Sequence, residues 1–245
     1  MVYYTREIRI QKSEPRIQRS ELRSSFGQQE ELKMLENLKS QLIDIAKIAY
    51  NKGMVNTYEG NISIRDGRFI CITPSGFPKC CLKEEMIPVI DIDGKVIEGD
   101  LKPSSEWKLH ALSYINRPDI NGIIHSHSPY TTAFAVANKA IETRAYAEMI
   151  SLFGKIPLAA YGTQSTDGIF KGVEEFINDY DVILLANHGV LSLGKDVYTA
   201  FYKLEAAESI AKVLILSEIL GGGKELSEEN LELLHRIRNE NSSAK

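Results

Sequence analysis

Hydrophobic residues recur at helical spacing in three stretches of the chain. From Gln28 to Gly53, apolar side chains return every three or four residues and the glycine supplies a stop signal, which predicts an amphipathic helix. The same spacing predicts a long helix from about Val197 to Leu220 and a charged terminal helix from Ser227 to about Arg238. We expect the first helix to serve as scaffold and His235, on the last helix, to face solvent.

Alternating apolar and polar positions predict two β-hairpins after the first helix. The paired runs flank the aspartate-glycine turns Asp66-Gly67 and Asp93-Gly94, and they cover residues 61–65 with 68–72 and residues 87–90 with 95–97. Hairpin connections join antiparallel strands, so the pattern favours a mostly antiparallel sheet over a doubly wound parallel one.

Two further apolar runs lead into histidines. The run from Asp119 ends in His125-Ser126-His127, just ahead of a helix predicted from Ser128 to Asn138. A second predicted strand, residues 181–186, is followed by His188 and a short partner strand over residues 190–193, and another helix start is predicted at Thr166-Asp167. Because alternate residues of a strand share a face, His125 and His127 point into one space.

The histidines admit two interpretations. With His188 and the carboxylate of Glu106, His125 and His127 would make a ligand set of the zinc type. From spacing alone, ordinary packing is the commoner explanation of a histidine pair at a strand end. His110, one helical turn after Glu106, is either a further ligand or a buried histidine satisfied by hydrogen bonds.

Three clusters of small polar residues also admit both a structural and a functional interpretation. Residues 59–61 and 73–76 contain the glycine, asparagine, proline and serine typical of turns, yet the same backbone could expose N–H groups to a phosphate. Ser104 and Ser105 precede a predicted helix, where one serine serves as a cap and the second leaves a hydroxyl for an anion.

Composition narrows the class of protein. A hydrophobic content of 43% in 245 residues is enough for a full core, and a net charge of −4 gives no electrostatic footprint for nucleic acid. No apolar run reaches the roughly 18 residues that cross a bilayer, and residues 1–11 lack the apolar centre of a secretory signal. Three cysteines make no disulfide framework, and we expect them to be small buried apolar side chains in a reducing cytoplasm.

Five short motifs stand out along the chain: Gly60-Asn61, Thr73-Pro74-Ser75-Gly76, Pro103-Ser104-Ser105-Glu106, His125-Ser126-His127 and Asn187-His188-Gly189. They occur in the order and approximate spacing of the class II aldolase/adducin family, which the chain resembles from about Leu32 to Leu220. The best match is to the fuculose-1-phosphate aldolase branch. We expect a catalytic domain over residues 28–220. Residues 1–27, which are polar and patternless, are expected to form an N-terminal arm and residues 221–245 a C-terminal helical extension, and both segments fall outside the resemblance. The resemblance implies a three-layer α/β/α sandwich with a mostly antiparallel sheet, assembled as a homotetramer with active sites between subunits.

The resemblance also implies roles for individual residues. Zn²⁺, or another divalent cation, would be held by the ligand set Glu106, His125, His127 and His188. The phosphate of a sugar phosphate would bind in a pocket made by Gly60, Asn61, Ser75, Gly76, Ser104 and Ser105. Glu106 and Tyr146 would be catalytic, with Tyr146 donated by a neighbouring subunit; taken alone, Tyr146 could equally be a half-buried core tyrosine.

The implied reaction is reversible cleavage of a ketose 1-phosphate, such as L-fuculose 1-phosphate, to dihydroxyacetone phosphate and a small aldehyde through a metal-stabilised enediolate. One departure is Glu59, since relatives usually have a small residue there and a carboxylate pointing inward would repel a phosphate. The epimerase branch typically carries aspartate at the position of Glu106, so glutamate favours carbon–carbon cleavage. Pentulose-phosphate 4-epimerase, methylthioribulose-1-phosphate dehydratase, an adducin-like interaction module and a lysine Schiff-base aldolase remain the alternatives.

Overall fold

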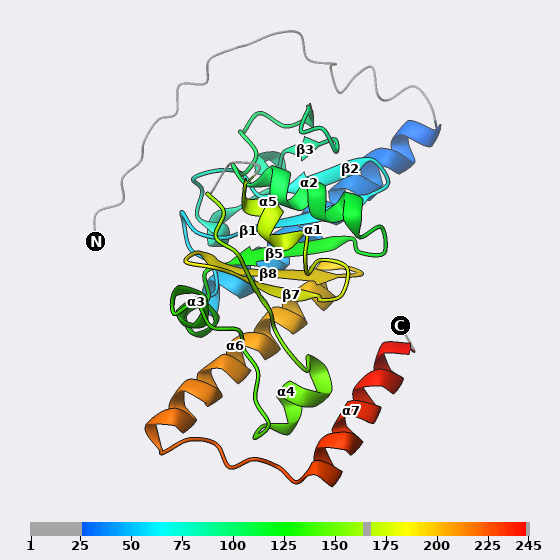
Figure 1. Ribbon diagram of the computed structural model, residues 1–245. Coiled ribbons are helices and arrows are strands. Elements are labelled where there is room, and N and C mark those ends of the chain that lie inside the picture. The colour runs from blue at the N-terminus through cyan, green and yellow to red at the C-terminus, as the bar shows by residue number, and fades with distance from the viewer. Residues whose placement is uncertain (1–25, 164–167, 244–245) are drawn as a thin grey trace, which may run out of the picture. The chain divides into compact units, whose positions relative to one another are not determined.

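An eight-stranded sheet organises the part of the chain described by the computed structural model, residues 26–163 and 168–243 (Figure 1). Its spatial order is β4-β3-β2-β1-β5-β8-β7-β6, and every neighbouring pair is antiparallel except β6 with β7. The strands are β1 (Asn61–Asp66), β2 (Phe69–Ile72), β3 (Val89–Ile90), β4 (Val96–Glu98), β5 (Gly122–Ser126), β6 (Leu158–Ala159), β7 (Val182–Leu185) and β8 (Gly189–Gly194). Both predicted hairpins are therefore confirmed.

Seven α-helices accompany the strands in the described residues. They are α1 (Phe26–Asn51), α2 (Trp107–Asn116), α3 (Pro129–Val136), α4 (Ala147–Leu152), α5 (Gly168–Val173), α6 (Val197–Ile219) and α7 (Glu228–Ser243), with short 3-10 turns η2 (Lys79–Cys81) and η3 (Glu84–Met86). The chain divides into two compact units, residues 1–36 and 37–245, and all strands belong to the second.

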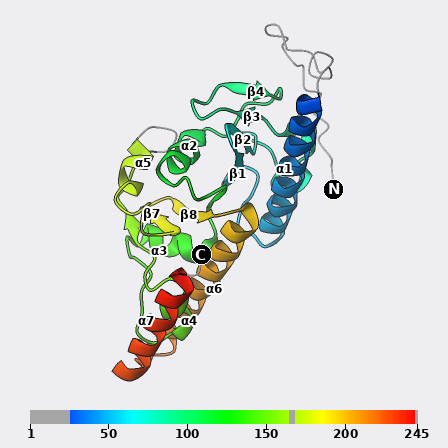
Figure 2. The same ribbon diagram turned by 90° about the vertical axis from the view of Figure 1, so that its right-hand side faces the viewer.

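Helices cover the sheet on both faces, as the three-layer prediction requires (Figure 2). Helices α2 and α5 contact each other on one face, and α3 and α6 pack together against β8 on the opposite face. The core between α2, α5 and the sheet is apolar and fully buried, with Leu109, Ile123 and Leu191 among its members. Burial of this apolar area is the main driving force for the arrangement.

The predicted elements differ from the observed ones in a few places. Helix α4 and the two-residue strand β6 were not predicted, because each is too short to show a period in the sequence. The predicted helix start at Thr166-Asp167 lies outside the described residues, as does most of the expected N-terminal arm. The limits of the three expected domains remain a prediction.

The cysteines correct one expectation. Cys71 is buried on β2, where desolvation raises the pKa of its thiol to about 12, but Cys80 is only half-buried and Cys81 is exposed. The last two belong to the η2 turn and are not core side chains. His235 is exposed on α7, as predicted, and none of the described helices is both long enough and apolar enough to cross a membrane.

Candidate metal centre and adjoining pocket

Three imidazoles converge at one end of the sheet. His125 is on β5, His127 directly follows that strand, and His188 lies in the turn between β7 and β8. Their candidate ligand nitrogens all lie within 4.8 Å of one another, and the Nε2 atoms of His125 and His127 are 3.0 Å apart. The predicted meeting of the two histidine motifs is thus confirmed.

Local backbone geometry explains how His188 reaches the pair. Asn187, before it, has a left-handed backbone with φ of 57°, a conformation that asparagine tolerates better than most residues. Gly189, after it, leaves no room for a side chain: a Cβ there would lie 2.4 Å from the carbonyl oxygen of Ser126 and 3.1 Å from Cδ2 of His127. The turn therefore packs directly against the end of β5.

Glu106 supplies a carboxylate beside the imidazoles. Its Oε2 lies 3.3 Å from Nε2 of His125, and its Oε1 lies 3.4 Å from Nε2 of His188. Glu106 occupies the N-cap position of α2, one residue earlier than the first-turn position expected from the sequence. In the described part of the chain, Oε1 of Glu106 and Nδ1 of His188 are buried without a hydrogen-bond partner, and two such atoms in one place indicate a site built for a ligand.

The electrostatics suit a cation. Burial lowers the pKa of His125 and of His188 to about 3, and it also lowers that of His127, so all three rings are neutral near pH 7. His125 donates through Nδ1 to the carbonyl oxygen of Val190 at 3.1 Å, which leaves the lone pair of Nε2 facing the other histidines. Neutral imidazoles with one carboxylate are a donor set that fits a divalent metal of the zinc type.

His110 is a buried hydrogen-bonded histidine and not a fourth imidazole of this cluster. Its Nδ1 lies 2.7 Å from Oγ of Ser63 and its Nε2 lies 2.5 Å from Oδ1 of Asn61. Asn61 in turn donates through Nδ2 to Oε2 of Glu106 at 2.8 Å. His110 therefore acts on the site indirectly, through the asparagine that contacts the carboxylate.

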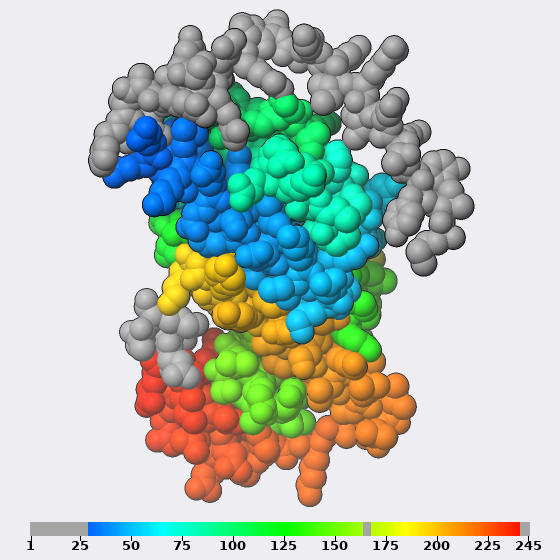
Figure 3. Space-filling model, turned by 180° about the vertical axis from the view of Figure 1, so that it is seen from behind, coloured from blue at the N-terminus to red at the C-terminus, as the bar shows by residue number. Residues whose placement is uncertain are grey.

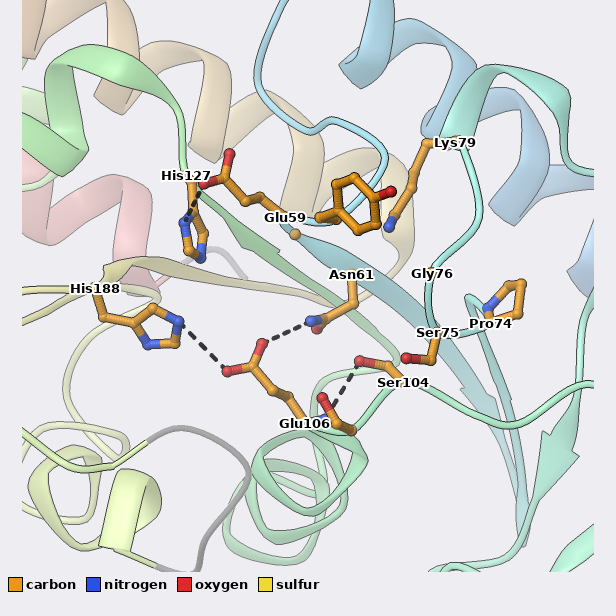
Figure 4. A pocket seen from close by; sticks show the side chains of 13 residues that line it. Glu59, Asn61, Pro74, Ser75, Gly76, Lys79, Ser104, Glu106, His127 and His188 are labelled. Atoms are coloured by element: carbon orange, nitrogen blue, oxygen red, sulfur yellow. Dashed lines mark hydrogen bonds and ion pairs between the residues drawn. The ribbon is translucent and has the colours of Figure 1, made fainter. Parts of the chain in front are cut away.

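A cavity of about 210 Å³ opens beside this cluster (Figure 4). All six residues expected to bind phosphate line it, together with Glu106, His127 and His188. The lining residues are Tyr58, Glu59, Gly60, Asn61, Pro74, Ser75, Gly76, Lys79, Ser104, Ser105, Glu106, His127 and His188. The structure thus joins three loops that are separated by tens of residues in the sequence.

The expected nest of backbone N–H groups is only partly present. The N–H of Ser75 is bonded to the carbonyl oxygen of Lys102 at 3.0 Å and that of Ser104 to the carbonyl oxygen of Thr73 at 3.1 Å, so neither is available to a ligand. Within the described residues, the N–H groups of Gly76 and Ser105 form no hydrogen bond and remain available. Oγ of Ser104 accepts from the N–H of Glu106 at 3.3 Å, which leaves its own O–H free to donate.

Glu59 does not point into the phosphate end of the cavity. Its Oε1 lies 3.8 Å from Nδ1 of His127 (Figure 4). Its other oxygen accepts a hydrogen bond from Nδ2 of Asn56. The carboxylate therefore lies beside His127 and away from Ser75 and Ser104. The next residue must be a glycine: Gly60 has a left-handed backbone with φ of 79°, and a Cβ there would lie 2.6 Å from Cγ1 of Val55.

Two further residues complete the comparison with the sequence. Tyr146 is half-buried at the N-cap position of α4 and is not among the described residues that line the cavity, so its catalytic role remains a prediction. Lys79 lines the cavity but was not identified from the sequence, because it lies outside every motif and only the fold of the η2 turn brings it to the pocket.

Comparison with known proteins identifies the family. Residues 40–215 match the family described as class II aldolase and adducin N-terminal domain. An L-fuculose phosphate aldolase from Methanocaldococcus jannaschii is 41% identical over 182 residues, covering 73% of this chain and 96% of the relative. A 5-deoxy-D-ribulose 1-phosphate aldolase from Bacillus thuringiensis is 32% identical over 204 residues, covering 82% of this chain and 95% of the relative.

A solved structure of an L-fuculose 1-phosphate aldolase is similar to the fold, with a TM-score of 0.75 and 31% identity over 82% of this chain and 95% of that one. The eight-stranded, mostly antiparallel sheet with helices on both faces is the arrangement that this similarity supports. With the histidine cluster in place and sequence similarity across most of its length, the chain belongs to the class II aldolase/adducin family and is an aldolase, a lyase, of that family.

Proposed function

We propose that the protein is a zinc-dependent aldolase that reversibly cleaves a ketose 1-phosphate, such as L-fuculose 1-phosphate, to dihydroxyacetone phosphate and a small aldehyde. The observation that carries the proposal is the placement of a neutral three-histidine cluster, with Glu106 beside it, in the wall of a cavity whose opposite wall holds hydroxyls and free N–H groups. That arrangement suits a substrate with a reacting carbonyl at one end and an anion at the other.

The metal would be held by His125, His127 and His188, with Glu106 as a fourth ligand in the absence of substrate. A divalent cation at this position supplies Lewis acidity, which stabilises negative charge developing beside the substrate carbonyl. Zinc is favoured over other divalent ions because the donors are mainly imidazole nitrogens, although the residues alone also admit another divalent metal.

Glu106 is the group that moves a proton at the substrate carbon. Its Oε1 has no hydrogen-bond partner in the described residues, so one oxygen is available for proton transfer while Asn61 holds the other at 2.8 Å. Its backbone N–H also donates to Oγ of Ser104 at 3.3 Å, which couples the carboxylate to the phosphate end of the cavity. Proton transfer and anion binding therefore share one short segment of chain.

The phosphate end is a positioning device. The hydroxyls of Ser75, Ser104 and Ser105, with the N–H groups of Gly76 and Ser105, would bind the non-reacting phosphate. Gly60 and Asn61 line the same cavity. Contacts to a remote group of the substrate fix the reacting carbons without taking part in the chemistry. Ser104→Ala should therefore weaken substrate binding more than turnover.

A homotetramer would complete the site. Tyr146, which would transfer the proton at the aldehyde oxygen, comes from a neighbouring subunit in this proposal because its own chain does not place it at the cavity. Helices α4, α6 and α7 lie together at the surface in Figure 3, and they expose apolar side chains that include Leu152, Leu216, Ile219 and Leu233. Such side chains support burial against other copies of the chain. A cytoplasmic location also remains a prediction.

The test is metal analysis combined with a panel of ketose 1-phosphates. Protein purified without chelator should contain about one zinc per chain, and cleavage should release dihydroxyacetone phosphate and an aldehyde that a coupled reductase detects. An intact epimeric sugar would instead indicate a 4-epimerase, and loss of water a dehydratase. Absence of bound metal together with no turnover of any substrate would favour the adducin-like module.

A Schiff-base aldolase has one observation in its favour, because Lys79 is a buried lysine that lines the cavity. Borohydride added with substrate would trap such an adduct on Lys79, and chelator would leave activity intact. We expect neither result, since the orphaned carboxylate oxygen and the neutral histidines are explained by a metal and not by an imine.

A further inference from the structure

Lys79 brings an amino group to the phosphate end of the cavity. The residue begins the η2 turn after Pro78, is 3% exposed, and extends its nitrogen toward the pocket (Figure 4). Among the described residues, its Nζ donates one hydrogen bond, to the carbonyl oxygen of Thr57 at 3.3 Å. Lysine is rarely buried without an anionic partner, because its ammonium group is costly to remove from water.

No carboxylate of the described residues forms an ion pair with Lys79. The two acidic side chains that line the same cavity, Glu59 and Glu106, lie against histidines instead. The other donors at this end are neutral hydroxyls and N–H groups. Lys79 is thus the only lysine or arginine among the described residues that line the cavity.

The energetics of this lysine change when an anion enters. Desolvation lowers its pKa to about 8, so the amine is mainly protonated at pH 7 but bears the cost of burial. A sugar phosphate carries roughly −1.5 to −2 charges near neutral pH and offers three strong acceptor oxygens. Its binding would give the ammonium group the counter-charge that the protein itself does not provide.

We propose that Lys79 is the cationic ligand of the substrate phosphate and gives the site its preference for phosphorylated over unphosphorylated sugars. The inference rests on the proposed function only for the statement that the bound phosphate belongs to a ketose 1-phosphate. Binding of phosphate by Lys79 can be measured without any turnover. The competing explanation is that Lys79 only secures the turn, through its buried carbon stem and its bond to Thr57.

The binding experiment uses full-length protein treated with chelator, so that bound metal cannot contribute, and inorganic phosphate followed by ³¹P NMR. Lys79→Met removes the ammonium and keeps the length of the stem. Lys83→Met is the matched control, because Lys83 is an exposed lysine four residues further on and changes the net charge equally. Loss of a charge-assisted contact should raise the dissociation constant of Lys79→Met about 10- to 100-fold, with no change for the control.

Lys79→Arg guards against a folding artefact, since it retains the positive charge and should retain phosphate binding while Lys79→Met loses it. Circular dichroism and metal stoichiometry of each variant verify that fold and metal cluster are intact. Two results would overturn the proposal: wild-type protein that binds no phosphate, or Lys79→Met that binds phosphate within about twofold of wild type.

Kinetics separate this inference from the proposed function. If the aldolase reaction is confirmed, Lys79→Met should raise KM for the ketose 1-phosphate with kcat nearly unchanged, and it should leave inhibition by unphosphorylated dihydroxyacetone as it is. A fall in kcat at unchanged KM would contradict the inference. Phosphate binding that depends on Lys79, in a protein that cleaves no ketose 1-phosphate, would refute the proposed function and leave the inference standing.

Discussion

The Nε2–H of His110 donates to Oδ1 of Asn61 across 2.5 Å, and this contact fixes the direction of a buried chain of hydrogen bonds. A carboxylate only accepts, so the contact between Asn61 and Glu106 must use the amide nitrogen, and the amide oxygen must face His110. Nδ1 of His110 then accepts from the hydroxyl of Ser63, whose oxygen is 2.8 Å from the hydroxyl of Tyr114. From Ser63 through His110 to Asn61, each donor points toward Glu106, whereas the hydroxyl of Tyr114 also donates to the carbonyl oxygen of Asn121 at 3.4 Å.

His110→Phe should impair catalysis without removing metal. It deprives Asn61 and Ser63 of a partner in a buried site, which we expect to cost about 1–3 kcal/mol of unfolding free energy and to lower kcat by freeing the asparagine amide to rotate. Urea denaturation, metal stoichiometry and steady-state kinetics measure the three quantities. Tyr114→Phe is the control, because it removes the distant end of the chain and should reduce stability more than kcat. Equal effects of both variants on kcat would argue against a positioning role.

His127→Ala should lose metal and activity together. Two imidazoles and Glu106 remain, and because Glu106 is displaced when substrate binds, this smaller ligand set holds the ion less tightly, so bound zinc measured after dialysis should fall well below one per chain. His235→Ala, on the exposed side of α7, is the matched control and should behave as wild type. Retention of stoichiometric zinc by His127→Ala would show that the histidine cluster is not the binding site.

Glu106→Gln should fold and should turn over slowly. The amide keeps the shape of the side chain, but it cannot accept a proton as the carboxylate does, so kcat should fall by about 10²–10⁴-fold. Circular dichroism confirms the fold, and rapid-quench measurement of aldehyde release gives the chemical step. Unchanged turnover would rule out the proton-transfer role assigned to this residue.

Gly189→Ala tests whether close packing of the turn brings the histidines together. The new methyl group would lie 2.4 Å from the carbonyl oxygen of Ser126, so the turn must move and carry His188 away from His125. We expect a loss of about 1–3 kcal/mol of unfolding free energy and a weaker affinity for zinc, measured by competition with a chromogenic chelator. Zinc affinity equal to that of wild type would show that the cluster tolerates displacement of the turn.

The unfolding free energy of the metal-free protein should fall as pH decreases from about 6.5 toward 3. Burial lowers the pKa of His110 and of His125 from 6.5 to about 3, so in this range the unfolded chain binds protons that the folded chain excludes. Each such histidine contributes a slope of up to about 1.4 kcal/mol per pH unit, and the stabilisation is fully present only above 6.5. Urea denaturation with chelator at several pH values measures the slope, and His110→Gln should reduce it. A stability independent of pH across this range would contradict the neutral, buried state of these rings.

Much of the architecture could be read from local pattern. The hairpins around Asp66-Gly67 and Asp93-Gly94 and the helices from Gln28 and Val197 were predictable, because turn chemistry and hydrophobic periodicity act over a few residues. Helix α4 and strand β6 were not, since elements of two to six residues form only where the rest of the fold supports them. The cysteines of the η2 turn were misjudged because composition carries no information on where a turn meets solvent.

The sequence by itself determined which chemical groups are available: imidazoles at strand ends, a carboxylate before a helix, and small polar residues in loops. Only the tertiary structure decided which of them meet. The register of β5 and β8 brings His188 next to His125. The fold also directs Glu59 toward His127, away from the phosphate end, and brings Lys79 to the wall of the cavity. Contacts between residues that are distant along the chain depend on strand pairing and core packing, and no pattern within a short stretch of residues contains that information.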